Sequence, residues 1–313
     1  MTFLLLLFVS LSRSAANPFV NGSFSVTSTA FFGVPFGASP FFNTLLFAPV
    51  DAGVVPVVVF VTGLDGIAPN WGYTDVHERL AAHGVAVASL DREALPNPTA
   101  ESLFLANWTA WFTQNVPALA AGHFGNTSLD LSRMLLSGHS AGGRLVVQSI
   151  VDDKFKSSAS IYSGVVLLDP VDGFDPFGII NNTIVHPPKM LNFTVPSLLL
   201  ASRLAAVQNG LFPPCASLEL GPDRFFRAFP GPVWLVNATA YGHVDFCDQW
   251  LIDLVGDTDF CVVSTAPKAK YRDFVAGMFM VAVQVFLNRD AAFLSFLTDP
   301  RLVPVLVTMQ HKA

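Results

Sequence analysis

The chain has 313 residues, a formal net charge of −6 at pH 7, and 13% charged against 52% hydrophobic residues, among them 29 Phe. This balance excludes a nucleic-acid-binding protein, because phosphate contacts need clustered lysines and arginines that the sequence lacks. The length suits one large domain. The apolar composition favours a lipophilic substrate or contact with a membrane surface.

Residues 1–16 are predicted to be a secretory signal peptide. An apolar run over 3–9 is followed by the small residues Ser14, Ala15 and Ala16, which suit signal peptidase, although no positive charge precedes the run. A membrane anchor is the alternative, but the run is shorter than the roughly 20 apolar residues that span a bilayer. One domain over 17–313 remains.

Passage through the secretory pathway would lead outside the cell, to a vacuole or, through the endoplasmic reticulum, into a plastid. It would also expose sequons for N-glycosylation. They begin at Asn21, Asn107, Asn126, Asn181, Asn192 and Asn237. An oxidising compartment also permits disulfides, and we expect Cys247 to pair with Cys261 and leave Cys215 free. Three buried, unpaired thiols are the alternative.

Strands and helices alternate along the predicted domain. An apolar run over 54–62 predicts a central strand, and helical periodicity over 75–83 precedes another short strand over 85–90. The alternation continues in helices 101–120, 144–151 and 268–287 and in strands 134–137, 165–168, 197–200 and 233–236. It predicts an α/β fold with a mostly parallel central sheet and helices on both faces.

The sequence GHSAG at 138–142 has the form of a nucleophile elbow, Gly-x-Ser-x-Gly, between the predicted strand and helix that flank it. The serine of an elbow stands on a strained turn, where a side chain two positions away would collide with neighbouring backbone. An ordinary glycine-rich turn is the alternative. The flanking elements favour the elbow, so Ser140 is predicted to be the nucleophile of a serine hydrolase.

A serine nucleophile needs a base and a carboxylate that orients the base, in the chain order Ser, Asp/Glu, His in the α/β-hydrolase fold. Asp169 directly follows the predicted strand 165–168 and is the expected acid, with Asp172 as second choice and Asp175 as a further loop carboxylate. His243 follows both the elbow and the acid, and comes after a strand. A hydrogen-bonded loop histidine is its alternative role.

Stabilising a tetrahedral oxyanion takes two backbone amides, normally one after the nucleophile and one after the third strand. These are predicted to be the amides of Ala141 and Leu64. Gly63 and Gly66 would let that loop approach the nucleophile.

Several segments together resemble the chlorophyllases, plant and algal hydrolases of the α/β-hydrolase superfamily. LDPVDG at 168–173 is similar to the acid-bearing motif of that family, and YGHVD at 241–245 to its histidine motif. LFPPCA at 211–216 and RDFVAG at 272–277 resemble two further signatures, so that the resemblance spans about 21–287. Two positions differ: Ala141 replaces the usual Arg, and Thr62 the usual His.

The resemblance implies hydrolysis of the phytyl ester of chlorophyll, with no metal or cofactor in the chemistry. A flat macrocycle and a long phytyl chain call for an apolar groove, to which we assign Gly63, Trp71, His139, Phe174, Phe177 and Phe212. Core packing is the alternative for the aromatic residues. An esterase of broader lipophilic specificity and an inactive protein that binds pigment or lipid are the other readings of the chain.

Overall fold

The structure, a computed structural model, describes residues 16–31, 43–63, 68–91, 98–152, 159–173 and 183–313. The strands of these residues form one mixed sheet. Their order is β1 (Val26–Phe31), β2 (Thr44–Pro49), β4 (Ala86–Leu90), β3 (Val54–Val61), β5 (Ser128–His139), β6 (Tyr162–Leu168), β7 (Ser197–Ser202), β8 (Val233–Ala238) and β9 (Val307–Lys312). Neighbours from β4 to β8 pair in parallel, and the pairs β1–β2, β2–β4 and β8–β9 are antiparallel. The predicted α/β fold with a mostly parallel sheet is confirmed.

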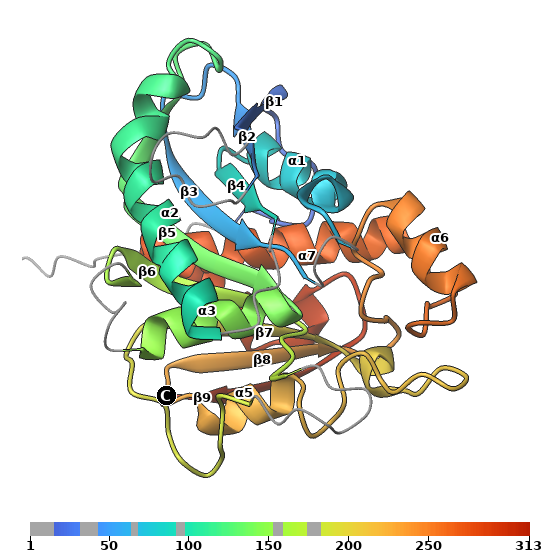
Figure 1. The fold of residues 1–313 in the computed structure, drawn as a ribbon. Coiled ribbons are helices and arrows are strands. Elements are labelled where there is room, and N and C mark those ends of the chain that lie inside the picture. Colours follow the sequence, from blue (N-terminus) through green and yellow to red (C-terminus); the bar gives the residue numbers. More distant parts are fainter. Residues whose placement is uncertain (1–15, 32–42, 64–67, 92–97, 153–158, 174–182) are drawn as a thin grey trace, which may run out of the picture.

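Helices cover both faces of the sheet (Figure 1). The core on one face includes α2 (Pro98–Leu119), α3 (Ala141–Val151) and α5 (Pro222–Ala228), and the core on the other includes α1 (Thr74–Ala82), α6 (Gln249–Asp257) and α7 (Lys268–Ala282). Because successive side chains of a strand point to opposite faces, one strand supplies both cores. In β3, Val57 and Val59 pack into the first core, and Val58 and Phe60 into the second.

Short elements complete the described chain. The turns η1 (Asn70–Tyr73) and η2 (Arg203–Ala206) follow strand ends, and α7 runs on into a π-helical turn, η3 (Val283–Leu287), so the predicted helix 268–287 is helical throughout. The turns η4 (Ala291–Leu297) and η5 (Pro300–Leu302) lead to β9 at the sheet edge. In the part of the chain that the structure describes, no helix is long and apolar enough to cross a membrane.

The disulfide predicted between Cys247 and Cys261 is wrong. Cys261 pairs instead with Cys215, with the Cα atoms 5.7 Å apart, and Cys247 is a free, fully buried thiol. The physical reason is that α6 intervenes between Cys247 and Cys261, whereas the loop after η2 brings Cys215 to the segment that follows α6. Burial raises the pKa of the Cys247 thiol well above its usual value, which favours an unreactive thiol.

The Cys215–Cys261 disulfide predicts a thiol count and a stability change. Denatured, unreduced protein should titrate with one thiol per chain, that of Cys247. The paired substitution Cys215→Ser with Cys261→Ser should lower the free energy of unfolding by about 2–4 kcal/mol, because the open chain regains loop entropy. Thiol titration and urea unfolding measure the two effects. Three titratable thiols in the unreduced protein would contradict the pairing.

Candidate active site

The predicted elbow is a sharp turn between β5 and α3. Ser140 adopts φ 54° and ψ −122°, a conformation that is strained for a residue with a side chain. A Cβ on Gly142 would lie 2.2 Å from the carbonyl oxygen of Thr62, and a Cβ on Gly138 2.6 Å from the backbone of Gly142. Both positions therefore require glycine, and the strained turn at Ser140 follows from this close packing.

Backbone hydrogen bonds hold Ser140 in place. Its N–H donates to the carbonyl of Leu168, 3.0 Å away, at the end of β6. Its own carbonyl accepts from the amides of Gly143 and Arg144, in the first turn of α3, and from Val171, which is two residues beyond Asp169. The elbow and the loop of the predicted acid are thus tied to one another through the backbone of the predicted nucleophile.

Asp169 lies buried at the carboxyl end of β6, with φ at 38°. Its N–H donates to the carbonyl of Leu200 in β7, and its Oδ1 accepts a hydrogen bond of 2.7 Å from the N–H of Ser202. Its Oδ2 lies 3.7 Å from Nδ1 of His243. One carboxylate oxygen is therefore fixed by the backbone, and the other faces the predicted base.

Asp172, the second choice for the acid, makes contacts away from His243. The carboxylate is fully buried, accepts from the amides of Ile184 and Val185, and pairs with Nε of Arg224 at 2.9 Å. Both oxygens are therefore occupied by contacts with Ile184, Val185 and Arg224. Asp175, the third loop carboxylate, lies outside the described residues.

His243 lies in the loop that follows β8 and is 5% exposed. Its Nδ1 has no hydrogen-bond partner among the described residues, and the 3.7 Å to Asp169 exceeds a hydrogen bond. Hydrogen bonds of catalytic groups commonly tighten only in the complex with substrate, so this distance is compatible with the predicted pair. The His243 ring packs against that of His139 in the elbow, with the ring centroids 4.6 Å apart, so the loop of the histidine directly adjoins the elbow.

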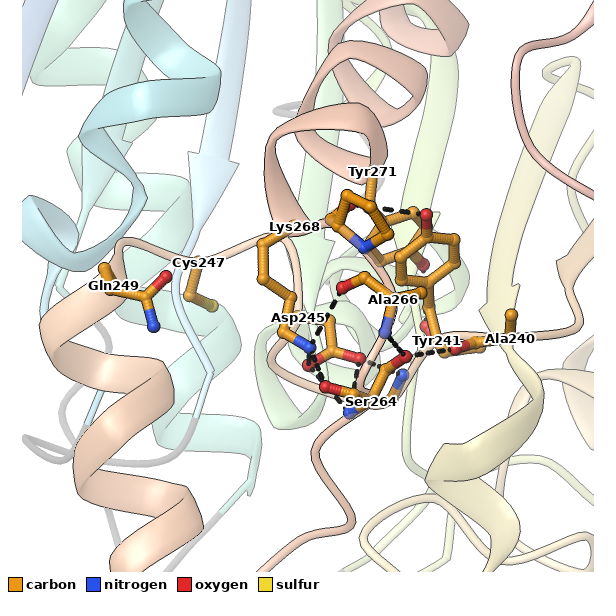
Figure 2. A network of polar contacts seen from close by, with 12 residues as sticks. Ala240, Tyr241, Asp245, Cys247, Gln249, Ser264, Ala266, Lys268 and Tyr271 are labelled. Carbon is orange, nitrogen blue, oxygen red and sulfur yellow. Dashed lines mark hydrogen bonds and ion pairs between the residues drawn. The ribbon is translucent and has the colours of Figure 1, made fainter.

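A network of polar contacts fixes the loop of His243 (Figure 2). The buried carboxylate of Asp245 accepts from the N–H of Gly242 at 2.6 Å and from the N–H of Ser264 at 3.1 Å, and it pairs with Nζ of Lys268 at 3.2 Å. Lys268 also donates to the carbonyl of Ser264. One carboxylate therefore joins the loop of His243 to Ser264 and to the first turn of α7.

Tyr271, one turn further along α7, supports both the histidine loop and the acid. Its ring stacks on Tyr241, with centroids 4.1 Å apart and planes inclined by 5°, and its hydroxyl lies 2.7 Å from that of Ser202, whose amide holds Asp169. Burial and then the charge of Asp169 raise the pKa of Tyr271 well above its usual value, so the phenol stays neutral. The pair Tyr271 and Ser202 links α7 to the predicted acid.

The remaining predicted site residues fall into three groups. Gly63 and His139 are buried in the hydrogen-bonded interior, and Ala141 is the first residue of α3. Trp71 is 52% exposed and stacks on Trp250, and Phe212 is 42% exposed and packs against Phe260. Leu64, Gly66, Phe174 and Phe177 lie outside the described residues.

The site contains polar residues that sequence reasoning did not single out. Asp245 stands two positions after His243 and within the segment 241–245, a spacing that could have drawn attention to it. Tyr73 comes from η1, Ser202 from β7, and Lys268 and Tyr271 from α7, and no local pattern marks them. Among the described residues, no group of three His, Cys, Asp or Glu side chains is arranged to hold a metal ion.

Comparison with known proteins shows the family of the chain. The family model described as Chlorophyllase matches residues 14–312. The chain belongs to the chlorophyllase family. Chlorophyllase-2 of Arabidopsis thaliana is 28% identical over 267 residues, which cover 80% of each chain, and Chlorophyllase-1 of the same plant is 25% identical over 82% of this chain and 80% of its own.

Chlorophyllase type 0 of Chenopodium album is 22% identical over 96% of this chain and 88% of its own. The resemblance inferred from the motifs is thereby confirmed. Membership in the chlorophyllase family supports an ester hydrolase with a lipophilic substrate.

Removal of the Asp245 charge should destabilise the protein. In Asp245→Asn, the amide retains one acceptor oxygen and leaves Lys268, whose side chain is 12% exposed, without its carboxylate. We expect a loss of about 2–5 kcal/mol in the free energy of unfolding, because breaking a buried ion pair leaves an uncompensated charge. Chemical unfolding monitored by circular dichroism measures it.

The matched control is Asp299→Asn, which breaks the pair between Asp299 and the exposed Arg301. Exposed ion pairs contribute little to stability, so its unfolding midpoint should stay near that of the wild type. Equal midpoints in the two variants would contradict the importance of the Asp245 network.

Proposed function

We propose that this protein is a serine carboxylic ester hydrolase that cleaves the phytyl ester of chlorophyll to chlorophyllide and phytol. The observation that carries the proposal is a serine on a strained turn that adjoins two loops, one with a buried carboxylate and one with a histidine. The imidazole of this histidine faces that carboxylate at 3.7 Å. The names of the relatives favour chlorophyll as the substrate. The reaction needs no metal or cofactor.

In the first half of the proposed reaction, Oγ of Ser140 attacks the ester carbonyl carbon while His243 takes the hydroxyl proton. Asp169 orients the imidazole and stabilises the imidazolium. The bond between the carbonyl carbon and the phytyl oxygen then breaks, and His243 returns the proton to phytol as it leaves. In the second half, water activated by His243 attacks the acyl-enzyme, which releases chlorophyllide and regenerates Ser140.

The amide of Ala141 is the proposed oxyanion donor. Ala141 begins α3, and the first amides of a helix have no acceptor within the helix and lie at the positive end of its dipole. They can therefore stabilise the negative oxygen that forms when Ser140 attacks. The amide of Leu64 is proposed as the second donor by analogy with the fold.

The second candidate function is hydrolysis of a wider range of lipophilic esters. The observation that favours it is Ala141, a small side chain next to the nucleophile where the family usually has Arg. Contact with a membrane surface is proposed to assist either activity. Trp71 and Phe212 are half-exposed aromatic residues, which suit contact with a lipophilic substrate.

Ser140→Ala should reduce ester hydrolysis by about 10⁴-fold to 10⁶-fold, because it removes the atom that forms the acyl-enzyme. Chlorophyll conversion to chlorophyllide, followed by chromatography, measures the effect. The matched control is Ser137→Ala, three residues earlier on β5. The Ser137 hydroxyl is buried without a hydrogen-bond partner among the described residues, so activity should persist. Retained activity in Ser140→Ala would overturn the mechanism.

Two assays separate the candidate functions. Turnover of chlorophyll alongside p-nitrophenyl acyl esters supports the chlorophyllase proposal, whereas robust turnover of the simple esters alone favours the broader esterase. A fluorophosphonate probe tests for an activated serine. An inert protein that binds pigment or lipid would give no covalent adduct at Ser140, and this outcome would contradict both hydrolase candidates.

We also propose that the chain enters the secretory pathway. Four sequon asparagines lie exposed in the structure: Asn21, Asn107, Asn126 and Asn192. Asn237 lies half-buried in β8 and is the least accessible of the described sequons, and Asn181 lies outside the described residues. A disulfide is also typical of proteins that fold in oxidising compartments.

Expression in a eukaryotic host tests the secretory proposal. The mature protein should begin after residue 16 and should lose mass on treatment with an N-glycosidase, since exposed sequons are acceptors. N-terminal sequencing and mass spectrometry measure both changes. An intact residue 1 together with an unchanged mass would contradict the proposal.

A further inference from the structure

A chain of three buried hydrogen bonds runs behind the proposed reacting groups. The amide of Gly63, at the end of β3, donates to the Tyr73 hydroxyl oxygen at 3.2 Å. That hydroxyl lies 2.8 Å from Nδ1 of His139, and Nε2 of His139 lies 3.1 Å from the backbone carbonyl oxygen of His243. The chain therefore joins the strand before the proposed oxyanion loop, the elbow and the histidine loop.

The donor and the acceptor of each of these three hydrogen bonds can be assigned. A carbonyl oxygen only accepts, so Nε2 of His139 must carry the hydrogen that bonds to His243. Nδ1 of a neutral imidazole then holds a lone pair and accepts from the Tyr73 hydroxyl. The Tyr73 oxygen in turn accepts from Gly63, whose amide only donates. His139 is thereby fixed in the tautomer that has hydrogen on Nε2.

A positive charge on His139 would not fit this arrangement. Nδ1 of a protonated ring would carry a hydrogen of its own, so the Tyr73 O–H would lose Nδ1 as its acceptor. Burial and then the neighbouring His243 lower the pKa of His139 well below its usual value, and burial is the main cause of the raised pKa of Tyr73. Both groups therefore stay neutral, and no charge on His139 opposes the imidazolium proposed to form on His243, whose ring is 4.6 Å away.

The chain is also closely packed. A Cβ on Gly63 would lie 2.9 Å from Nδ1 of His139 and 3.3 Å from the Tyr73 hydroxyl oxygen. Tyr73 is fully buried and His139 is 2% exposed. The imidazole of His139 has both nitrogens occupied inside the protein, so its geometry suits a support for the site better than the substrate contact predicted from the sequence.

The geometry points to His139 as a positioning residue for His243. The Tyr73 hydroxyl fixes the tautomer of His139, and the Nε2–H of His139 then holds the backbone carbonyl of His243, whose side chain is proposed to transfer the proton. This inference rests on the proposed function, because it assigns His139 a task in bringing His243 to Ser140. An error in the position of a catalytic group of about 1 Å costs up to 100-fold in rate, so the effect should be measurable in kcat.

The kinetic test removes one oxygen. Tyr73→Phe should lower kcat for a p-nitrophenyl ester about 10-fold to 100-fold with KM unchanged. The reason is that His139 is no longer held in the tautomer that donates to the backbone of His243, while the substrate surface stays the same. The matched control is Tyr162→Phe. Tyr162 is also buried, and its hydroxyl contacts Thr109 at 2.9 Å on the side of the sheet covered by α2 and α3. Its kcat should stay within about twofold of the wild type.

A second pair of variants tests the hydrogen bond itself. His139→Gln keeps a side-chain N–H that can donate to the carbonyl of His243, whereas His139→Leu has a similar size and no donor. The Gln variant should retain about tenfold more kcat than the Leu variant, a rescue that packing alone would not give. Equal kcat in these two variants, or equal kcat in Tyr73→Phe and Tyr162→Phe, would overturn the inference.

A measurement without substrate separates this inference from the proposed function. The ¹⁵N chemical shifts of the imidazole signals that disappear in His139→Gln should show hydrogen on Nε2 in the wild type near pH 7. Hydrogen on Nδ1 would overturn the inference even in a fully active enzyme. If the wild type neither hydrolyses esters nor reacts with a fluorophosphonate, the proposed function fails, whereas the predicted tautomer is still tested by its spectrum.

Discussion

The site depends on a close approach of three backbones that only glycine permits. Gly142, in the first turn of α3, lies against the carbonyl oxygens at the end of β3, and Gly138 lies against that same turn. This contact leaves the residue between them in a strained conformation, and the carbonyl of Ser140 then accepts a hydrogen bond from Val171 in the loop of Asp169. The absence of a side chain at Gly138 and Gly142 thus determines the position of the serine and, through it, that of the carboxylate loop.

The apolar composition has a structural explanation that does not require a lipophilic ligand. A sheet covered on both faces needs two cores, and phenylalanines fill much of both. Nine of them are among the largest fully buried side chains: Phe47, Phe60, Phe112, Phe124, Phe225, Phe229, Phe246, Phe274 and Phe279. Within the residues that the structure describes, the aromatic content therefore argues for a large buried volume first, and for a substrate groove through half-exposed side chains such as Trp71 and Phe212.

The sequence was informative wherever function and fold leave a local pattern. The run 54–62 predicted a strand buried on both faces, and GHSAG at 138–142 predicted the turn, because backbone contacts there exclude side chains. It was uninformative where partners come from distant segments. The disulfide of Cys215 depends on where α6 places Cys261, and the hydroxyl of Tyr73 meets His139 across 66 residues of chain. Such contacts follow from the tertiary packing and have no short-range signature.

The first turn of α7 directs three polar side chains from one face of the helix toward the site and its supporting loops. Lys268, Tyr271 and Arg272 occupy positions i, i+3 and i+4, which share one face of a helix. Lys268 reaches Asp245, Tyr271 reaches Ser202 and Tyr241, and Arg272 donates to the carbonyl of Cys247 and pairs with Asp75. A single inserted or deleted residue in this turn would rotate the face by about 100° and remove several of these contacts at once. The length of the first turn of α7 is therefore as tightly constrained as the three side chains that it carries.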